Sequence, residues 1–341
     1  MQENPYNKVN IPCVFRLKLK NIKIFIGDKM KELSIVIPAY NEQKNVGLLY
    51  NKLEEVLSSM KISYEIIYID DGSTDKTFIE LEGLQKKDQN ITVIKFRGNF
   101  GQTFALDAGF KAAQGKVIIS IDADLQNDPA DIPILLTKMK EGYDVVCGWR
   151  RNRKDSLIKH IISRGAYLLR KTLFKDEIHD SGCTLKAFKR ECFDDLDLFG
   201  EMHRYIPALL SWQGFKITEV AVRHHKRKYG KTKYTIKRVV KGFLDMIVVK
   251  FWMGYSSRPI YLFGGFGLLM VIIGFVIGLY LSIQKILAYD SYTLSNRPLL
   301  LLSILLIILG VQFVVSGLLA DIVIKTYYRK GKPYKIEKEL K

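Results

Sequence analysis

Cysteine is scarce in this chain of 341 residues, which has four: Cys13, Cys147, Cys183 and Cys192. No two of them form a CxxC pair or share a metal-ligand spacing with histidine, so the sequence offers no thiolate metal site. We interpret the thiols as reduced, in a cytoplasmic domain. Acidic residues are also outnumbered, 35 against 53 basic ones, which gives a formal net charge of +18. Such an excess predicts an anionic partner: nucleic acid, a membrane surface or a phosphorylated substrate.

Two common phosphate-binding loops are missing as well. No GxGxxG and no GxxxxGK[ST] pattern follows a predicted strand, so a phosphorylated substrate would need a metal ion to screen its charge. A secretory signal is also missing, because the first residues lack a basic start followed by an apolar core. We expect residues 1–30 to be an extension that precedes the first domain.

Two long apolar segments lie toward the C-terminus. Tyr261 to Ile283 and Pro298 to Ala320 each run for 23 residues without a charged side chain. At ~1.5 Å per residue, a helix of this length covers a bilayer core of ~30 Å. We therefore predict transmembrane helices over residues 260–283 and 298–320, joined as a hairpin. A buried helix of a soluble fold is the alternative.

Flanking charge predicts the orientation of this hairpin. Val222–Lys241 contains nine Lys or Arg and no acid, and Lys325–Lys341 contains seven Lys or Arg and two Glu. The loop between the spans has two basic residues and one acidic residue. Because basic residues are enriched on the cytoplasmic side, we expect a multi-pass protein of the cell membrane. Its soluble domain, both termini and a basic tail at 321–341 would face the cytoplasm.

A basic amphipathic segment precedes the first span. In residues 235–258, Lys237 and Lys241 lie on one side of a helical pattern, with Val240 and Phe243 on another. This pattern predicts a helix in the membrane interface, with its basic side toward lipid headgroups. An amphipathic helix packed on the soluble domain is the alternative.

Residues 33–150 alternate short apolar runs with helical patterns, which predicts an α/β domain with a mostly parallel sheet, and we expect this domain to span residues 31–234. The predicted strands are LSIVIPAY, YEIIYIDDGS, ITVIKF, KVIISIDAD and YDVVCGWR. Ligands of such sheets bind at the carboxyl ends of the strands. Polar clusters follow three of these ends, namely PAYNE, DDGS and DADLQ. We therefore expect a binding site where the three clusters meet.

The third cluster carries two aspartates at a spacing that suits a divalent cation. Asp122 and Asp124 lie two residues apart at a strand end, so both carboxylates approach one ion if the backbone turns there. Mg²⁺ or Mn²⁺ takes such hard oxygen ligands and completes its shell with phosphate oxygens. The amide oxygen of Gln126 is a candidate third ligand. A solvated acidic turn is the alternative.

Taken together, the motifs resemble a known family. They are PAYNE (Pro38–Glu42), DDGSTD (Asp70–Asp75), DADLQNDP (Asp122–Pro129), GWR (Gly148–Arg150), HDSGCTLKAFKR (His179–Arg190), HRYIPAL (His203–Leu209) and RHHKRKYGKTKY (Arg223–Tyr234). The set is similar to family 2 glycosyltransferases of the GT-A fold, and among them to the dolichyl- and undecaprenyl-phosphate sugar transferases. It covers about residues 31 to 325. The resemblance implies a GT-A domain, then an interfacial helix and a transmembrane hairpin, in an inverting enzyme. A UDP- or GDP-sugar would be the donor, polyprenyl phosphate the acceptor, and a homo-tetramer a plausible assembly.

The resemblance also implies roles for residues. It implies a donor site formed by Pro38, Tyr40, Asn41, Glu42, Asp70, Asp71, Asn99, Gly101 and Gln102. It implies that Asp122, Asp124 and Gln126 hold Mg²⁺ or Mn²⁺, which would stabilise the departing nucleoside diphosphate. Asp180 is a candidate base or sugar-orienting carboxylate, and a cap of the following turn is the alternative.

The acceptor favours a site rich in basic residues. A lipid monophosphate is largely ionised at neutral pH, so its oxygen attacks the anomeric carbon without a strong general base. The candidates for binding the acceptor and the diphosphate are Arg150, Arg153, Arg223, Arg227, Lys231 and Lys233. We expect Arg150 and Arg227 nearest the phosphates, because a guanidinium binds two phosphate oxygens at once. Attraction to lipid headgroups is the alternative for several of the others.

Other functions account for less of the sequence. A glycosyltransferase acting on a lipid hydroxyl shares the domain and the membrane, but it needs a base for a neutral acceptor. A non-enzymatic flippase or transporter would not need three acidic strand ends. A polysaccharide synthase would need more spans and a QxxRW pattern, which the sequence lacks. A nucleic-acid binder explains the charge but not the spans, so we expect no nucleic-acid partner.

Overall fold

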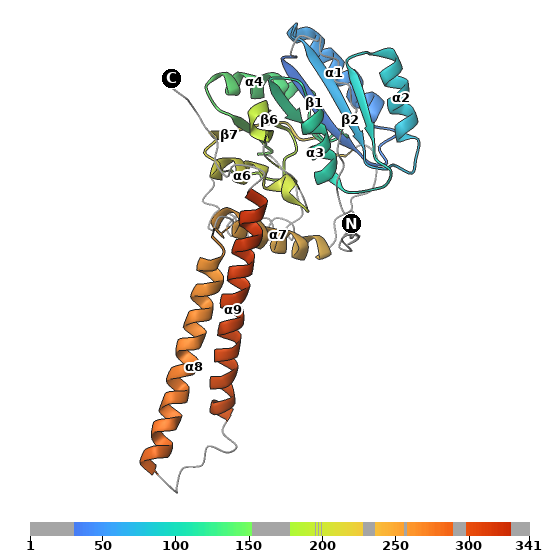
Figure 1. Ribbon diagram of the computed structural model, residues 1–341. Helices are drawn as coiled ribbons and strands as arrows, with labels where there is room; N and C mark the ends of the chain where they lie inside the picture. Colours follow the sequence, from blue (N-terminus) through green and yellow to red (C-terminus); the bar gives the residue numbers. More distant parts are fainter. Residues whose placement is uncertain are drawn as a thin grey trace, which may run out of the picture. The chain divides into compact units, whose positions relative to one another are not determined.

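The computed structural model describes residues 31–151, 178–194, 196, 198, 200–227, 236–255, 258–288 and 298–328. Within these ranges one seven-stranded sheet runs in the order β3-β2-β1-β4-β6-β5-β7 (Figure 1). Its strands are β1 (Leu33–Ala39), β2 (Tyr64–Asp70), β3 (Ile91–Lys95), β4 (Val117–Ser120), β5 (Val145–Trp149), β6 (Lys186–Lys189) and β7 (Ile217–Ala221). The predicted mostly parallel sheet is confirmed, and each predicted strand is present. The expectation for residues 1–30 lies outside the described ranges.

One strand runs against the others. β6 lies antiparallel between β4 and β5, and its first residue, Lys186, pairs with Ser120 at the end of β4. β7 then adds to the other side of β5 in parallel. Neither β6 nor β7 was predicted, because KAFK and ITEVA are short and weakly apolar. β6 places the segment before Lys186 at the carboxyl end of β4, beside the predicted site.

Helices cover both faces of the sheet (Figure 1). They are α1 (Val46–Met60), α2 (Thr77–Lys87), α3 (Gln102–Ala112), α4 (Ile132–Lys140) and α6 (Ile206–Trp212), with 3₁₀ turns η1 (Pro129–Asp131), η2 (Arg190–Phe193) and η3 (Met202–Arg204). Strand β1 contributes to both hydrophobic clusters, because successive side chains of a strand point to opposite faces of the sheet. Ile35 and Ile37 pack in one cluster with the leucines of α1, whereas Val36 packs in the other with Leu106 and Phe110 of α3.

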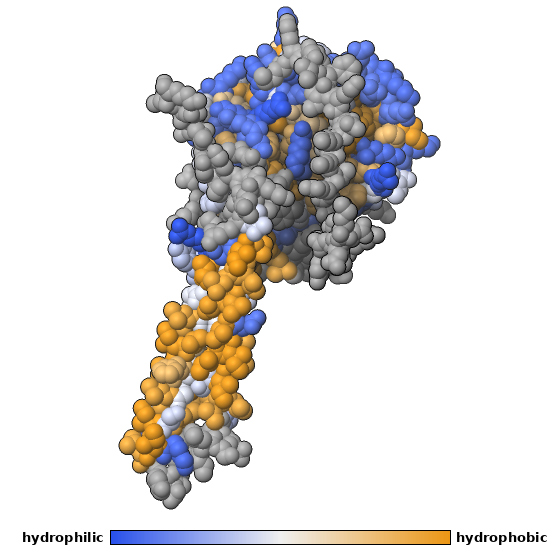
Figure 2. All heavy atoms as spheres, in the orientation of Figure 1, coloured by the Kyte–Doolittle hydropathy of each residue, from blue (hydrophilic) through white to orange (hydrophobic). Residues whose placement is uncertain are grey.

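Two helices of the described chain, α8 (Ile260–Ala288) and α9 (Pro298–Tyr328), are long and apolar enough to cross a membrane. Figure 2 shows hydrophobic atoms along both of them. They touch along a seam of small residues, where a Cβ on Gly267 would lie 2.5 Å from the carbonyl oxygen of Gly310. The helices run to Ala288 and Tyr328, past the predicted ends of both spans.

Helix α7 (Ile236–Tyr255) precedes α8 and has two kinds of surface. Met246 and Val249 are buried in the cluster that also holds residues of α6. Leu244, Ile247 and Val248 are exposed. The helix therefore packs on the soluble domain and still offers apolar side chains to a membrane interface. The side chains of its predicted basic side lie outside the described ones.

The contact of α3 with the sheet gives a test of the fold. A Cβ on Gly109 would lie 2.3 Å from Val36 Cγ1 and 2.7 Å from Ile69 Cδ1, both in fully buried side chains. We expect Gly109→Ala to lower the free energy of unfolding by about 1–3 kcal/mol through overpacking. Thermal unfolding of the full chain in detergent micelles measures this change.

Gly83→Ala is the matched control, because Gly83 lies inside α2 with no atom near its would-be Cβ. That substitution should stabilise the protein by about 0.5–1 kcal/mol through helix propensity. Equal effects of the two substitutions would contradict the packing described for α3.

Candidate active site at the carboxyl edge of the sheet

The loops after β1 and β2 are fastened to each other. Asn41 has a left-handed backbone (φ +57°), a conformation that asparagine tolerates better than most residues. Its Oδ1 accepts from the backbone N–H of Thr74 at 2.8 Å, and its own N–H donates to Ser73 Oγ at 3.0 Å. The N–H of Glu42 donates to Thr77 Oγ1 at 2.8 Å. The PAYNE and DDGSTD motifs therefore form one hydrogen-bonded rim, which follows Pro38 of β1 and Tyr40.

Asp71 ties a third loop to this rim. Its carboxylate accepts from the N–H groups of Phe100 (2.8 Å) and Gly101 (2.9 Å) and from Asn99 Nδ2 (3.1 Å). Burial raises the pKa of Asp71, while the two backbone bonds act in the opposite direction. Its neighbour Asp70 is fully buried and accepts from the N–H of Ser73 at 3.0 Å. The structure thus brings the predicted donor residues of three loops together.

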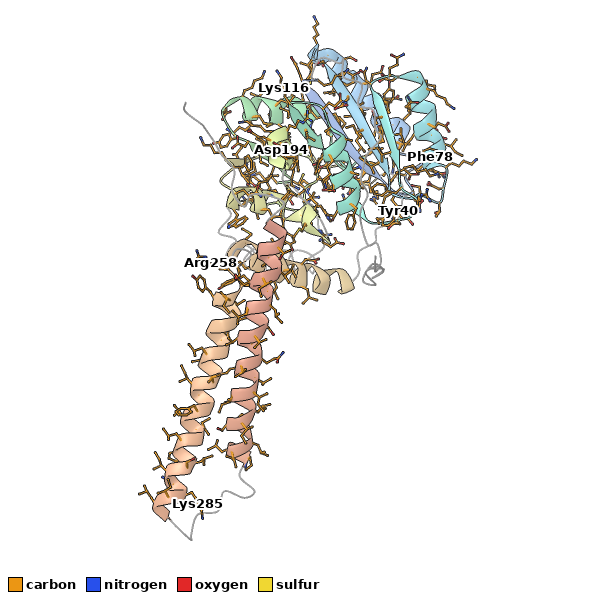
Figure 3. The ribbon with its side chains drawn as sticks, in the orientation of Figure 1. Tyr40, Phe78, Lys116, Asp194, Arg258 and Lys285 are labelled. Atoms are coloured by element: carbon orange, nitrogen blue, oxygen red, sulfur yellow. The ribbon has the colours of Figure 1, made fainter. Side chains whose placement is uncertain are left out.

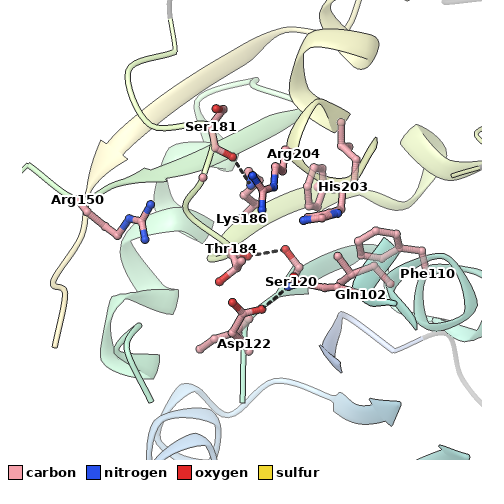
Figure 4. A pocket seen from close by; sticks show the side chains of 15 residues that line it. Gln102, Phe110, Ser120, Asp122, Arg150, Ser181, Thr184, Lys186, His203 and Arg204 are labelled. Atoms are coloured by element: carbon pink, nitrogen blue, oxygen red, sulfur yellow. Dashed lines mark hydrogen bonds between the residues drawn. The ribbon is translucent and has the colours of Figure 1, made fainter. Parts of the chain in front are cut away.

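The turn after β4 holds the two predicted metal ligands. Asp124 is buried, and its Oδ1 accepts from the N–H of Gln126 at 3.1 Å. Leu125 between them has φ +61°, which is rare for a residue with a branched side chain and costs conformational energy. Asp122 accepts from Gln102 Nε2 at 2.7 Å (Figure 4). The backbone turn that the sequence analysis required is therefore present.

The electrostatics of this turn suit a cation. Burial, and next the carboxylate of Asp124, raise the pKa of Asp122 to about 7, against the effect of the Thr184 hydroxyl and of Lys186 and Arg150. The described residues hold no cluster of three or more His, Cys, Asp or Glu that could bind a metal. An ion here would have two carboxylates, with the Gln126 amide as a further candidate, and would take its other oxygens from a ligand. Mg²⁺ and Mn²⁺ bind in this manner beside phosphates.

Arg150 and Asp180 form a two-pronged ion pair. Arg150 Nε lies 2.6 Å from Asp180 Oδ2, and its Nη2 lies 2.8 Å from Oδ1. Both side chains are largely buried, at 11% and 13% exposure, and the pairing raises the pKa of Arg150. Asp180, the candidate base, thus orients Arg150 in this structure.

The segment after β7 lies along the Asp122–Asp131 turn. Arg223 Nε donates to Asp131 Oδ1 at 2.9 Å, and the N–H of His225 donates to the carbonyl of Gln126 at 2.8 Å. Arg227 Nη2 lies 2.9 Å from Asp124 Oδ2. It also lies 3.7 Å from Glu42 Oε1.

The pairing of Arg227 therefore joins the β4 turn to the rim. Arg223, by contrast, pairs with Asp131 and so attaches the segment after β7 to the turn after β4. Its side chain is half exposed. The other predicted basic residues, Arg153, Lys231 and Lys233, lie outside the described residues.

A pocket of about 250 Å³ opens beside Asp122 (Figure 4). It is lined by Gln102, Leu106, Phe110, Ser120, Ile121, Asp122, Arg150, Ser181, Gly182, Thr184, Lys186, Phe188, His203, Arg204 and Ile206. The sequence analysis gave no role to Thr184 or Lys186, although both lie inside the HDSGCTLKAFKR motif. His203 is held by Thr103 Oγ1, 2.7 Å from its Nδ1. Polar and apolar side chains both line the pocket.

Comparison with known proteins agrees with this geometry. Residues 34–197 match the family model described as glycosyl transferase family 2. A dodecaprenyl-phosphate galacturonate synthase from Rhizobium johnstonii is 37% identical over 303 residues, covering 87% of this chain and 89% of the relative. An undecaprenyl-phosphate 4-deoxy-4-formamido-L-arabinose transferase from Klebsiella pneumoniae is 32% identical over 299 residues, covering 87% and 90%.

Solved structures show the same fold. Glucosyl-3-phosphoglycerate synthase from Mycobacterium tuberculosis, in complex with Mn²⁺, UDP and phosphoglyceric acid, superposes with a TM-score of 0.52. The sequences are 19% identical, and the match covers 67% of this chain and 81% of the other. The expected GT-A fold of the soluble domain is thereby confirmed.

The three bonds accepted by Asp71 give a test of the site. We expect Asp71→Ala to release residues 99–101 and to speed chymotryptic cleavage after Phe100 by about tenfold or more, because three donors of this loop lose their shared acceptor. Limited proteolysis of the full chain, followed by mass spectrometry, measures this rate. Asp194→Ala, on an exposed residue, should cleave as the unaltered protein does. An unchanged rate in Asp71→Ala would show that other contacts hold the loop.

Proposed function

The chain belongs to glycosyl transferase family 2, and we propose that it transfers a sugar from a nucleotide-sugar donor to the phosphate of a polyprenyl phosphate at a membrane. One observation carries the proposal. Two carboxylates, Asp122 and the buried Asp124, follow β4: Asp124 pairs with Arg227, and Asp122 lines a pocket that also has basic side chains in its wall. Relatives more than 30% identical over most of their length are named as prenyl-phosphate sugar transferases. Two helices long and apolar enough to cross a membrane follow the domain, and a membrane is where a lipid acceptor would lie.

Asp122 and Asp124 would hold the divalent cation, with Gln126 as the further ligand. When bound, Mg²⁺ or Mn²⁺ supplies positive charge to the diphosphate of the donor as negative charge builds on it. Arg227 contributes a second positive charge at the same edge, because its pairing with Asp124 fixes it there. Mn²⁺ and UDP occur together in the mycobacterial structure, which supports a divalent ion and a uridine donor.

The reaction needs no strong base. An oxygen of the ionised acceptor phosphate attacks the anomeric carbon, the bond from that carbon to the diphosphate breaks, and the nucleoside diphosphate leaves with the electron pair. The configuration at the anomeric carbon is inverted. Asp180 suits this scheme as a positioning residue, because both of its oxygens already bind Arg150. Arg150 in turn lines the pocket beside Asp122, where an anionic acceptor would meet the donor.

The membrane arrangement is part of the proposal. The charge pattern supports a cytoplasmic domain, two spans and an external loop. A cysteine placed at Ser291, in the loop between the spans, should react with an impermeant maleimide added to intact cells. Protection of that cysteine from the maleimide would contradict the proposed orientation. The tetramer implied by the resemblance stays a prediction.

The assay of this function uses membranes that contain the full chain, undecaprenyl phosphate and labelled donors. The panel includes UDP-galacturonate, UDP-4-deoxy-4-formamido-L-arabinose, UDP-glucose and GDP-mannose. We expect an acid-labile, lipid-linked monosaccharide from one of them, and its formation should stop with EDTA and return with Mn²⁺ or Mg²⁺. Product on a lipid hydroxyl, or no product from any donor, would contradict the proposal.

Asp124→Ala tests the residue basis of the same activity. The substitution removes a metal ligand and the partner of Arg227, so we expect transfer to be lost while the protein still inserts in membranes. Asp194→Ala removes an exposed carboxylate elsewhere in the fold and should transfer normally. Normal turnover by Asp124→Ala would contradict the assignment of Asp124 as a metal ligand.

A further inference from the structure

A buried lysine lies in the wall of the pocket. Lys186 begins β6 and is 4% exposed, yet its side chain lines the cavity beside Asp122. Its Nζ donates to the carbonyl oxygens of Ser181 (3.3 Å) and Cys183. Figure 4 shows it on the far side of Thr184 from Asp122. The antiparallel course of β6 brings it there, because Lys186 pairs with Ser120 at the end of β4.

The contacts of Lys186 leave its charge without a counterion at hydrogen-bond distance. Both acceptors are neutral carbonyls, and among the described residues no salt bridge to Lys186 is found. An ammonium has three N–H donors, so one is left for another partner. Burying such a charge is costly unless an anion or a set of strong acceptors offsets it.

The other cations of the pocket differ in this respect. Arg150 is held by both oxygens of Asp180, and Arg204 lies 3.9 Å from Glu201. Asp122 and Lys186 both line the pocket, whereas Asp124 and Arg227 do not. Among the lysine and arginine side chains that line the pocket, Lys186 is thus the one with no carboxylate within salt-bridge distance in the described part of the chain.

We propose that Lys186 binds an oxyanion of a substrate inside this pocket. The oxyanion is either the phosphate of the lipid acceptor or a carboxylate on an acidic donor sugar, and both present the same charged oxygens to the ammonium. The inference rests on the proposed function, which supplies the two substrates. Lys186 would then contact substrate in addition to the residues of the turn after β4.

The test compares Lys186→Met, Lys186→Arg and Lys116→Met in the transfer assay. Lys116→Met is the matched control, because Lys116 is exposed and precedes β4 at the opposite end of the strand (Figure 3). Initial rates are measured against undecaprenyl phosphate and against the donor that supports transfer. The inhibition constant of the nucleoside diphosphate released from that donor, and the thermal midpoint, report on the fold and on the diphosphate site.

If the acceptor phosphate is the ligand, Lys186→Met should raise the KM for undecaprenyl phosphate by about tenfold or more, as expected for a lost hydrogen bond to a charged group. If a sugar carboxylate is the ligand, the KM should instead rise for an acidic donor such as UDP-galacturonate and not for UDP-galactose. In either case Lys186→Arg should restore much of the loss, and the inhibition constant should be unchanged.

Unchanged KM values in Lys186→Met would overturn the inference. So would a general loss in which the inhibition constant and the thermal midpoint move with every KM, since that result describes a lysine that merely holds the carbonyls of residues 181–183. Absence of transfer in the unaltered protein is a different outcome, because it contradicts the proposed function itself.

Discussion

The repulsion between Asp122 and Asp124 is the constraint on which the site depends. Two carboxylates follow the same strand, and burial and next the negative charge of Asp124 raise the pKa of Asp122. The protein offsets them with an amide from Gln102, a guanidinium from Arg227 and the nearby charges of Arg150 and Lys186. The proposed divalent cation would offset this repulsion further, because both carboxylates would bind it.

The surrounding loops are built to keep these charges in place. The side chains of Asn41 and Asp71 accept hydrogen bonds from neighbouring loops, so the rim of the proposed donor site is held together by contacts within the chain. Asp180 likewise holds Arg150 in place by accepting its hydrogen bonds, and Asp131 holds Arg223. Residues that look alike in the sequence as basic candidates therefore divide into those that fasten the fold and those that face the site. This division follows from their partners and not from their charge.

Much of the architecture could be predicted from local pattern. Apolar runs identified five strands, the polar clusters after three of them identified the edge at which these converge, and charge-free segments identified the two long helices. The antiparallel β6 could not be predicted, because its four residues gain their strand conformation from pairing with β4 and β5. Lys186 was missed for the same reason. The pairings of Asp180 and Arg223 join residues 30 and 92 positions apart, respectively, which no spacing rule reveals.

Direct measurement of metal binding tests the central claim. Mn²⁺ is titrated into the purified full chain in detergent, with and without UDP or GDP, and the free ion is followed by electron paramagnetic resonance. We predict that a nucleoside diphosphate promotes Mn²⁺ uptake and that Asp122→Asn weakens it by about tenfold or more, since a charged ligand is lost. Uptake of equal affinity in that variant, or no uptake with either diphosphate, would contradict the claim.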